Sequence, residues 1–137
     1  MKRRTFMALG ATSLVLPTAV FAAPAEYTPG LVQKRLAKGE TVFLDFKASW
    51  CSTCRAQERV IKALKGTNPD YENKITFIDV DWDDFGGSDL VKTLNIPRRS
   101  TLVVLKGDKE LGRIVAQTGQ DEIKALMDVA LKAANVT

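Results

Sequence analysis

The stretch Trp50-Cys51-Ser52-Thr53-Cys54 contains both cysteines of this 137-residue chain, and it follows an apolar, strand-like run over residues 41–46. If a helix begins at Cys51, Cys54 lies one turn further along the same face, so the two sulfurs can meet. The unpaired N–H groups of such a helix N-terminus favour the Cys51 thiolate. A thiolate with a second thiol near enough to resolve a mixed disulfide indicates a redox centre.

Other chemistries of a cysteine pair fit this sequence less well. A zinc site needs about four ligands, and the chain has no histidine. Haem attachment needs a histidine after the second cysteine, where Arg55 stands. A structural disulfide across so short a loop would stabilise the fold little. Two thiolates could still hold a soft ion such as copper(I), so a binding module remains an alternative. We predict no metal site and no cofactor.

The first 22 residues have the features of a removed signal peptide. A basic start, Lys2-Arg3-Arg4, precedes a short apolar stretch over residues 6–20, and small residues surround Ala22. That apolar stretch contains Pro17 and is shorter than the roughly 20 residues that a membrane span needs. We therefore expect cleavage after Ala22 and a single mature domain over residues 23–137, without a stable membrane span.

The segment Arg3-Arg4-Thr5-Phe6-Met7 also resembles the twin-arginine export motif, although a general secretory signal can begin with arginines too. Either route leads out of a bacterial cytoplasm, to a compartment in which disulfides persist. We predict a periplasmic location, with the twin-arginine route favoured. Removing the signal lowers the formal net charge from +4 to +1, so the composition does not favour a nucleic-acid partner.

Hydrophobic periodicity and turn residues predict an alternation of helices and strands in the mature chain. Helices are expected over residues 30–38, 51–65, 89–94 (capped by Ser88) and 120–134, and strands over 41–46, 75–80, 101–105 and 110–115. Residues 23–27 are interpreted as a short leader, and residues 68–70 and 81–87 as loop or turn. The first two strands should be parallel and the last two antiparallel. The predicted fold class is α/β, a mixed four-stranded sheet with helices on both faces.

With the dithiol placed after the first strand of this pattern, residues 28–135 resemble the thioredoxin-fold thiol–disulfide oxidoreductases. The segment from Asp45 to Cys54 and the C-terminal strand–turn–strand–helix carry the resemblance. Within the family, the chain is similar to periplasmic thioredoxin-like domains, including the C-terminal reductant domain of the membrane disulfide-interchange protein DsbD. The resemblance implies a thioredoxin-like fold and disulfide exchange with partner proteins, without a flavin or nicotinamide cofactor.

The resemblance also implies roles for individual residues. Cys51 would be an exposed nucleophile and Cys54 a buried resolving thiol, with Trp50 beside them on the docking surface. Asp45 matches a buried acid that could take the Cys54 proton, although strand alternation does not settle whether Asp45 points inward or to solvent. Glu58 matches an acid of the DsbD-type domains and shares a helical face with Cys54, where a surface glutamate is the ordinary interpretation.

The loop before the third strand departs from the family pattern. Thioredoxin folds carry a cis-proline facing the dithiol, and here Ser100 takes that position, with Pro97 as the alternative. A cis bond before serine costs about 2.5–4 kcal/mol, so either the loop is strained or the bond is trans. The resemblance makes Arg99, Ser100 and Thr101 candidate substrate-binding residues. Arg98 and Arg99 would form a positive rim that attracts acidic partners.

Acidic residues around the pair bear on the direction of exchange. Asp79 stands where cytoplasmic thioredoxins often place a lysine, and if it faces Asp45 their repulsion should raise one pKa. If Asp45 and Glu58 lie near the sulfurs, their charge should disfavour the Cys51 thiolate, which argues against a strong oxidant. We predict a monomeric reductant that receives electrons from a separate thiol protein. A disulfide-forming oxidant and a client-binding or metal-binding module are the alternatives.

Overall fold

The computed structural model describes Gly10 and residues 23–136. The predicted signal peptide, apart from Gly10, therefore lies outside the described residues. The elements follow in the order β1 (Ala25–Glu26), α1 (Leu31–Ala37), β2 (Thr41–Lys47), α2 (Ser52–Thr67), α3 (Asp70–Lys74), β3 (Thr76–Asp81), α4 (Trp82–Phe85), α5 (Asp89–Leu94), β4 (Thr101–Lys106), β5 (Lys109–Val115) and α6 (Gln120–Ala134). None of the helices within these described residues is long and apolar enough to cross a membrane.

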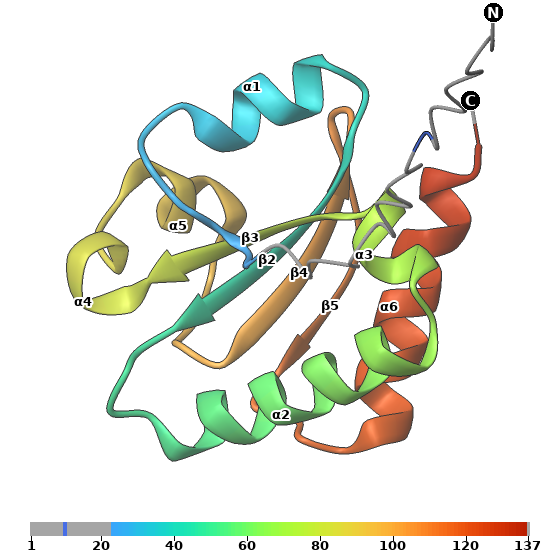
Figure 1. Cartoon of the computed structure of the whole chain (residues 1–137). Helices are drawn as coiled ribbons and strands as arrows, with labels where there is room; N and C mark the ends of the chain where they lie inside the picture. The colour runs from blue at the N-terminus through green and yellow to red at the C-terminus, as the bar shows by residue number, and fades with distance from the viewer. Residues whose placement is uncertain (1–9, 11–22, 137) are drawn as a thin grey trace, which may run out of the picture.

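One mixed sheet forms the centre of the molecule, with the strands in the order β1-β3-β2-β4-β5 (Figure 1). β2 and β3 are parallel, whereas β4 runs antiparallel to both β2 and β5, as predicted. Helices α1, α4 and α5 lie on one side of the sheet, and α2, α3 and α6 on the other (Figure 1). The predicted α/β class with helices on both faces is confirmed.

The sheet has five strands rather than the predicted four. The extra strand, β1, comes from the segment interpreted as a leader, because Ala25 pairs with Ile78 and Glu26 with Asp79 of β3. Tyr27 continues the pairing by donating its N–H to the Asp79 carbonyl at 2.9 Å, and its ring packs edge-on against Phe85. A strand of two residues is too short for an alternating pattern, so the sequence held no periodic signal for it.

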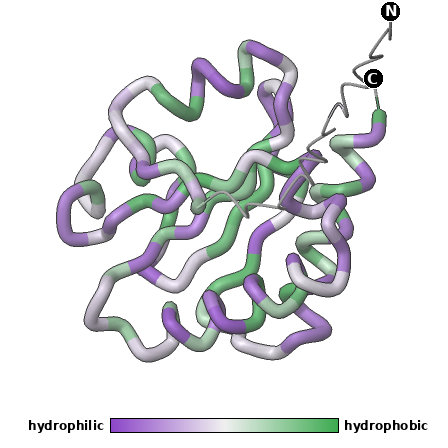
Figure 2. Tube along the Cα trace, viewed as in Figure 1, coloured by the Kyte–Doolittle hydropathy of each residue, from purple (hydrophilic) through white to green (hydrophobic). Residues whose placement is uncertain are grey.

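Alternation along β2 divides the core into two apolar clusters. Val42, Leu44 and Phe46 pack with residues of α1 and α5, whereas Phe43 packs with residues of α2 and α6. Because successive side chains point to opposite faces, Asp45 and Lys47 share the Phe43 face, below α2. Apolar residues gather accordingly in the central strands (Figure 2).

The remaining differences from the prediction are the start of α1 and two additional short helices. Thr28-Pro29 predicts a cap and a first helical residue, but α1 begins after Gly30, which has a left-handed φ of 89° and is the N-cap residue in place of Thr28. α3 and α4 are short helices where loop and turn were expected, and the Asp81 carboxylate caps α4 by accepting from the Asp83 N–H at 2.9 Å. The predicted Ser88 cap of α5 and the bounds of α6 are confirmed. Single-turn helices carry too few residues to show a helical period.

Candidate active site: a dithiol at the start of α2

The cysteine pair lies where the chain leaves β2 and enters α2. Cys51 is the N-cap residue of α2, and its sulfur accepts a hydrogen bond from the Cys54 N–H at 3.2 Å. Both thiols are free. The predicted helix start is thus confirmed, and one of the N–H groups that the helix leaves unpaired is aimed at the Cys51 sulfur.

Both sulfurs are buried, which corrects the expectation that Cys51 is exposed. Cys51 is 2% exposed and Cys54 1% exposed. They form a small cluster with Ala48, and the indole of Trp82 packs against it from the start of α4. No sequence pattern placed Trp82 there, because it belongs to a segment interpreted as a turn.

Ser100 contacts both sulfurs. Its hydroxyl oxygen lies 3.2 Å from the Cys51 sulfur and 3.1 Å from the Cys54 sulfur, and the residue is fully buried. Pro97 is exposed, so Ser100 is the residue that faces the dithiol. Every peptide bond of the described residues is trans, and Ser100 instead has a φ of 64°, in the left-handed region. The sequence left two outcomes open, a trans bond or a strained loop, and the structure has both.

Three hydrogen bonds to the backbone groups of Ser100 hold it in this conformation. Its N–H donates to the Phe46 carbonyl at 2.7 Å, and its carbonyl accepts from the Ala116 N–H at 2.8 Å. The same carbonyl accepts from the side-chain amide of Gln57 at 3.0 Å, and this amide also donates to the Gln117 carbonyl at 3.0 Å. The loop is therefore tied to β2, to α2 and to the end of β5.

The prediction missed Gln57, although its position carried a signal. Gln57 lies three residues after Cys54 and four before Ile61, so it falls on the buried face of α2. A polar residue at helical spacing among apolar ones needs internal hydrogen-bond partners, since burying an unpaired amide is costly. The loop carbonyls of Ser100 and Gln117 are those partners.

The exposed Trp50 and the half-buried Arg99 form the rim beside the sulfurs. Trp50 is 54% exposed, and its indole N–H donates to the Asp83 carboxylate at 3.1 Å. The Arg99 guanidinium stacks on the Trp50 ring, 4.4 Å from its centroid. Thr101, in contrast, is buried, and its hydroxyl donates to the Arg98 carbonyl at 2.7 Å. Thr101 thus shapes the loop and does not reach the surface that a partner would meet.

Asp45 is buried beneath this region and points inward. The β2–β3 register places it directly opposite Asp79, and paired residues point to the same face of a sheet. Burial raises the pKa of the Asp45 carboxyl to about 8, and the Asp79 charge adds to this effect. Of the alternatives left open, the structure selects an inward Asp45 that faces Asp79. At neutral pH the carboxyl group therefore holds its proton.

Lys47 supplies the positive charge that position 79 lacks. Its ammonium group lies 3.2 Å from the Glu58 carboxylate and 3.6 Å from that of Asp79. Burial disfavours the Lys47 charge, but Asp79, Asp45 and Glu58 outweigh it and raise the Lys47 pKa. Lys47 was not among the predicted site residues, although its position two residues after Asp45 places it on the same strand face.

Glu58 acts on the site through this charge cluster. Its carboxylate pairs with Lys47 and, at 3.4 Å, with Lys62. Partial burial acts to raise the Glu58 pKa, but the two lysines lower it below its ordinary value. Glu58 is therefore ionised at neutral pH and has no proton to donate. Its charge contributes to the raised pKa of Asp45.

The two thiols differ in acidity. Burial acts to raise the Cys51 pKa, but hydrogen bonds from the Cys54 thiol, Ser100, the Cys54 N–H and Arg99 outweigh it and lower the pKa to about 7. Burial raises the pKa of Cys54, and the hydrogen bond with Cys51 adds to this. The expectation that nearby acids would disfavour the Cys51 thiolate was wrong, because Asp45 is protonated and lysines compensate Glu58.

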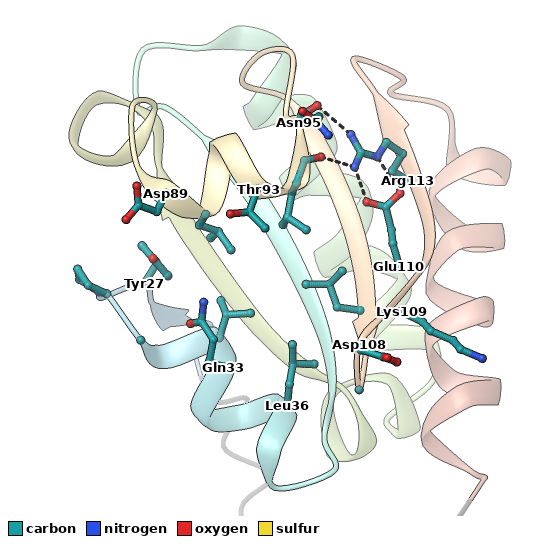
Figure 3. Close-up of a pocket in the computed structure, with 17 residues that line it drawn as sticks. Tyr27, Gln33, Leu36, Asp89, Thr93, Asn95, Asp108, Lys109, Glu110 and Arg113 are labelled. Carbon is teal, nitrogen blue, oxygen red and sulfur yellow. Dashed lines mark hydrogen bonds and ion pairs between the residues drawn. The ribbon is translucent and has the colours of Figure 1, made fainter.

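A second hollow is separate from the dithiol. A cavity of about 730 Å³ lies between α1, α5 and the β4–β5 hairpin (Figure 3). There the Arg113 guanidinium donates to the carbonyls of Leu94 and Asn95 at 2.7 and 3.2 Å and pairs with Glu110. Arg113 thus joins the hairpin to the end of α5, so its charge is used within the fold.

A family model described as thioredoxin matches residues 24–129. The chain belongs to the thioredoxin family. Among its thioredoxin relatives, Thioredoxin H2-1 of Oryza sativa subsp. japonica is 30% identical over 96 residues, which cover 70% of this chain and 64% of the relative. Thioredoxin H2 of Arabidopsis thaliana is 35% identical over 81 residues, which cover 59% of this chain and 56% of the relative. The chain thus spans less than two thirds of either relative's length.

Solved thioredoxin-like structures share the fold. Trxlp from Edwardsiella tarda EIB202 aligns with a TM-score of 0.63 at 23% identity, covering 77% of this chain and 96% of that one. Plasmodium falciparum thioredoxin aligns with a TM-score of 0.62 at 23% identity, covering 76% of this chain and 96% of that one. The predicted thioredoxin-like fold is confirmed, whereas the similarity to the DsbD reductant domain stays a prediction.

Proposed function

We propose that this thioredoxin-family protein is a thiol–disulfide oxidoreductase that acts on disulfides of partner proteins. The observation that carries the proposal is the unequal acidity of two free, adjoining thiols. Cys51, with a pKa of about 7, is substantially ionised at neutral pH, whereas Cys54 keeps its proton. A thiol whose pKa lies near the ambient pH combines thiolate population with nucleophilicity.

The exchange takes place in two displacements. The Cys51 thiolate attacks one sulfur of the partner disulfide, a mixed disulfide forms, and the other partner sulfur leaves as a thiolate. Cys54 then loses its proton and attacks the Cys51 sulfur, so that the second partner thiolate leaves. The partner gains two electrons and becomes a dithiol, and the protein retains a Cys51–Cys54 disulfide. A separate thiol protein would restore the reduced pair.

Asp45 is the proposed acceptor of the Cys54 proton. The negative charge of Cys51 is one of the influences that raise the Asp45 pKa. When Cys51 enters the mixed disulfide, this charge disappears, so the Asp45 pKa falls and its carboxylate becomes more populated. The carboxylate thus becomes available when Cys54 must ionise.

We favour the reducing direction over oxidation. A strong oxidant such as DsbA stabilises its thiolate to a pKa of about 3.5, whereas thioredoxin has a value of about 7. The Cys51 pKa of about 7 matches the second case. A role like that of the DsbD reductant domain is consistent with this acidity and with the proposed export of the protein to the periplasm by its N-terminal signal.

The reduction potential tests the direction of exchange. Equilibration of the purified protein with glutathione buffers should give a potential below about −200 mV, and a value near about −120 mV would show an oxidant. In parallel, Cys54→Ser should trap mixed disulfides with periplasmic partners, whereas Cys51→Ser should trap none. Client binding that persists when both cysteines are replaced would favour a binding module instead.

A further inference from the structure

The Ser100 hydroxyl lies at nearly equal distances from two sulfurs that react in turn. It is 3.2 Å from the Cys51 sulfur and 3.1 Å from the Cys54 sulfur, and either partner can be the donor in each contact. A hydroxyl group has one hydrogen to donate and two lone pairs to accept with. Ser100 can therefore donate to one sulfur while it accepts from the thiol of the other.

The backbone of Ser100 is held in an unfavourable conformation that places this hydroxyl. A φ of 64° is uncommon for a residue with a Cβ atom. The bonds to Phe46, Ala116 and Gln57 fix both polar groups of the Ser100 backbone. Sparsely populated backbone conformations persist only where the surroundings over-determine them, and they concentrate at functional sites.

The side chain of Ser100 serves the sulfurs and not a docked partner. Ser100 is fully buried, so its hydroxyl does not reach the rim formed by Trp50 and Arg99. The Cys54 N–H is fixed by the helix and points to the Cys51 sulfur alone. The rotatable hydroxyl of Ser100, in contrast, is within reach of both sulfurs.

We propose that Ser100 is an alternating hydrogen-bond donor that stabilises first the Cys51 thiolate and then the Cys54 thiolate. The inference rests on the proposed exchange reaction. In the reduced protein the Ser100 O–H donates to the Cys51 sulfur. Once Cys51 is bonded to the partner sulfur, it no longer carries charge. The hydroxyl then rotates and donates to the Cys54 sulfur as the Cys54 proton leaves to Asp45. Ser100 keeps its own proton throughout.

A single stopped-flow reaction with the aromatic disulfide DTNB reads both steps. Attack by Cys51 releases a first thionitrobenzoate, and attack by Cys54 on the resulting mixed disulfide releases a second. We expect Ser100→Ala to shift the pH midpoint of the first phase upward by about one unit and to slow the second phase about tenfold at pH 7. Alkylation of Cys51 by iodoacetamide should show the same shift of midpoint without any exchange.

Two further variants separate the hydroxyl from the backbone and from general stability. Ser100→Gly lacks the hydroxyl but adopts a positive φ without strain, so it should reproduce the defects of Ser100→Ala. Ser88→Ala removes a hydroxyl that caps α5 and should lower stability while leaving both phases unchanged.

Each contrary result has a distinct meaning. Wild-type rates in Ser100→Gly would assign the effect to backbone strain and overturn the proposal. An unaffected second phase, or an unaffected Cys51 midpoint, in Ser100→Ala would also overturn it. A wild-type protein that releases only the first thionitrobenzoate would contradict both the exchange function and the alternation. Normal biphasic exchange in the wild type with no effect of either Ser100 variant would remove the alternation alone.

Discussion

The Asp45 carboxyl group stays protonated at neutral pH in the folded protein because burial raises its pKa. It lies on an apolar strand face, opposite another aspartate, and its Oδ1 atom has no hydrogen-bond partner among the described residues. Lys47 offsets part of the unfavourable electrostatics but is itself shared between Glu58 and Asp79. Such an arrangement lowers stability at neutral pH and is typical of a group kept for its proton chemistry.

Replacement of Asp45 by Asn should stabilise the protein at high pH. The Asp45 pKa of about 8 lies above the value near 3.9 of an unfolded chain, so between these values the folded state holds a proton that the unfolded state has lost. The contribution of Asp45 to stability is therefore complete below about pH 4 and is lost as the pH rises through about 8. We expect Asp45→Asn to exceed the wild type by at least about 2 kcal/mol at pH 9, with little difference near pH 4.

Urea denaturation at several pH values measures this difference. Asp84→Asn, at an exposed position of α4, is the control and should follow the wild-type profile. Profiles for Asp45→Asn and wild type that run parallel from pH 4 to pH 9 would contradict the assignment of a raised pKa to Asp45.

At the scale of elements, α2 joins three parts of the site. Its N-terminus contains Cys51 and Cys54, Glu58 reaches down to the charges on β2, and Gln57 holds the loop before β4 and the segment after β5. The helix therefore fixes the position of the Ser100 loop relative to the two sulfurs. A loss of the Gln57 amide should loosen both attachments together.

Gln57→Leu tests this coupling between α2 and the two loops. The substitution keeps the approximate size of the side chain but removes the Gln57 hydrogen bond to the Gln117 carbonyl and one of the two bonds to the buried Ser100 carbonyl. We expect the free energy of unfolding to fall by about 1–3 kcal/mol. The control Gln33→Leu, at an exposed position of α1, should change it by less than about 0.5 kcal/mol. Equal stability of the two variants would show that the Gln57 bonds are not needed.

At the scale of the whole molecule, the elements predicted correctly were those with a periodic pattern of apolar side chains or a recognisable cap. α6 has a long apolar face and α5 a serine cap, and both lie where the sequence placed them. β1 and α4 are too short to show a period, so only tertiary contacts define them. The cysteine pair and Asp45 followed from their spacing and the family resemblance. Gln57 and Lys47 were missed although their spacing placed them on the faces of α2 and β2 that form the site. Trp82 joined the site through a contact between distant segments, which local pattern does not encode.

At the scale of the whole molecule, the predicted N-terminal signal implies that the protein is exported. Expressed in a bacterium with both export routes, the protein should be recovered from the periplasm with Ala23 as its first residue. Replacing Arg3 and Arg4 by lysines should retain it in the cytoplasm, since the twin-arginine route requires the pair. Lys2→Gln keeps the pair and should be exported. Unchanged export of the double-lysine variant, measured by fractionation and intact mass, would point to the general secretory route.

β1 forms one edge of the sheet and covers the outer side of β3. Without Ala25, Glu26 and the Tyr27 N–H, β3 would present unpaired backbone groups along its outer side, including the Asp79 carbonyl. Unpaired strand edges bind other strands and promote aggregation. The predicted cut after Ala22 leaves Ala23 and Pro24 ahead of this border strand. A cut only a few residues further along would therefore leave a domain that still contains its dithiol but has an edge open to self-association.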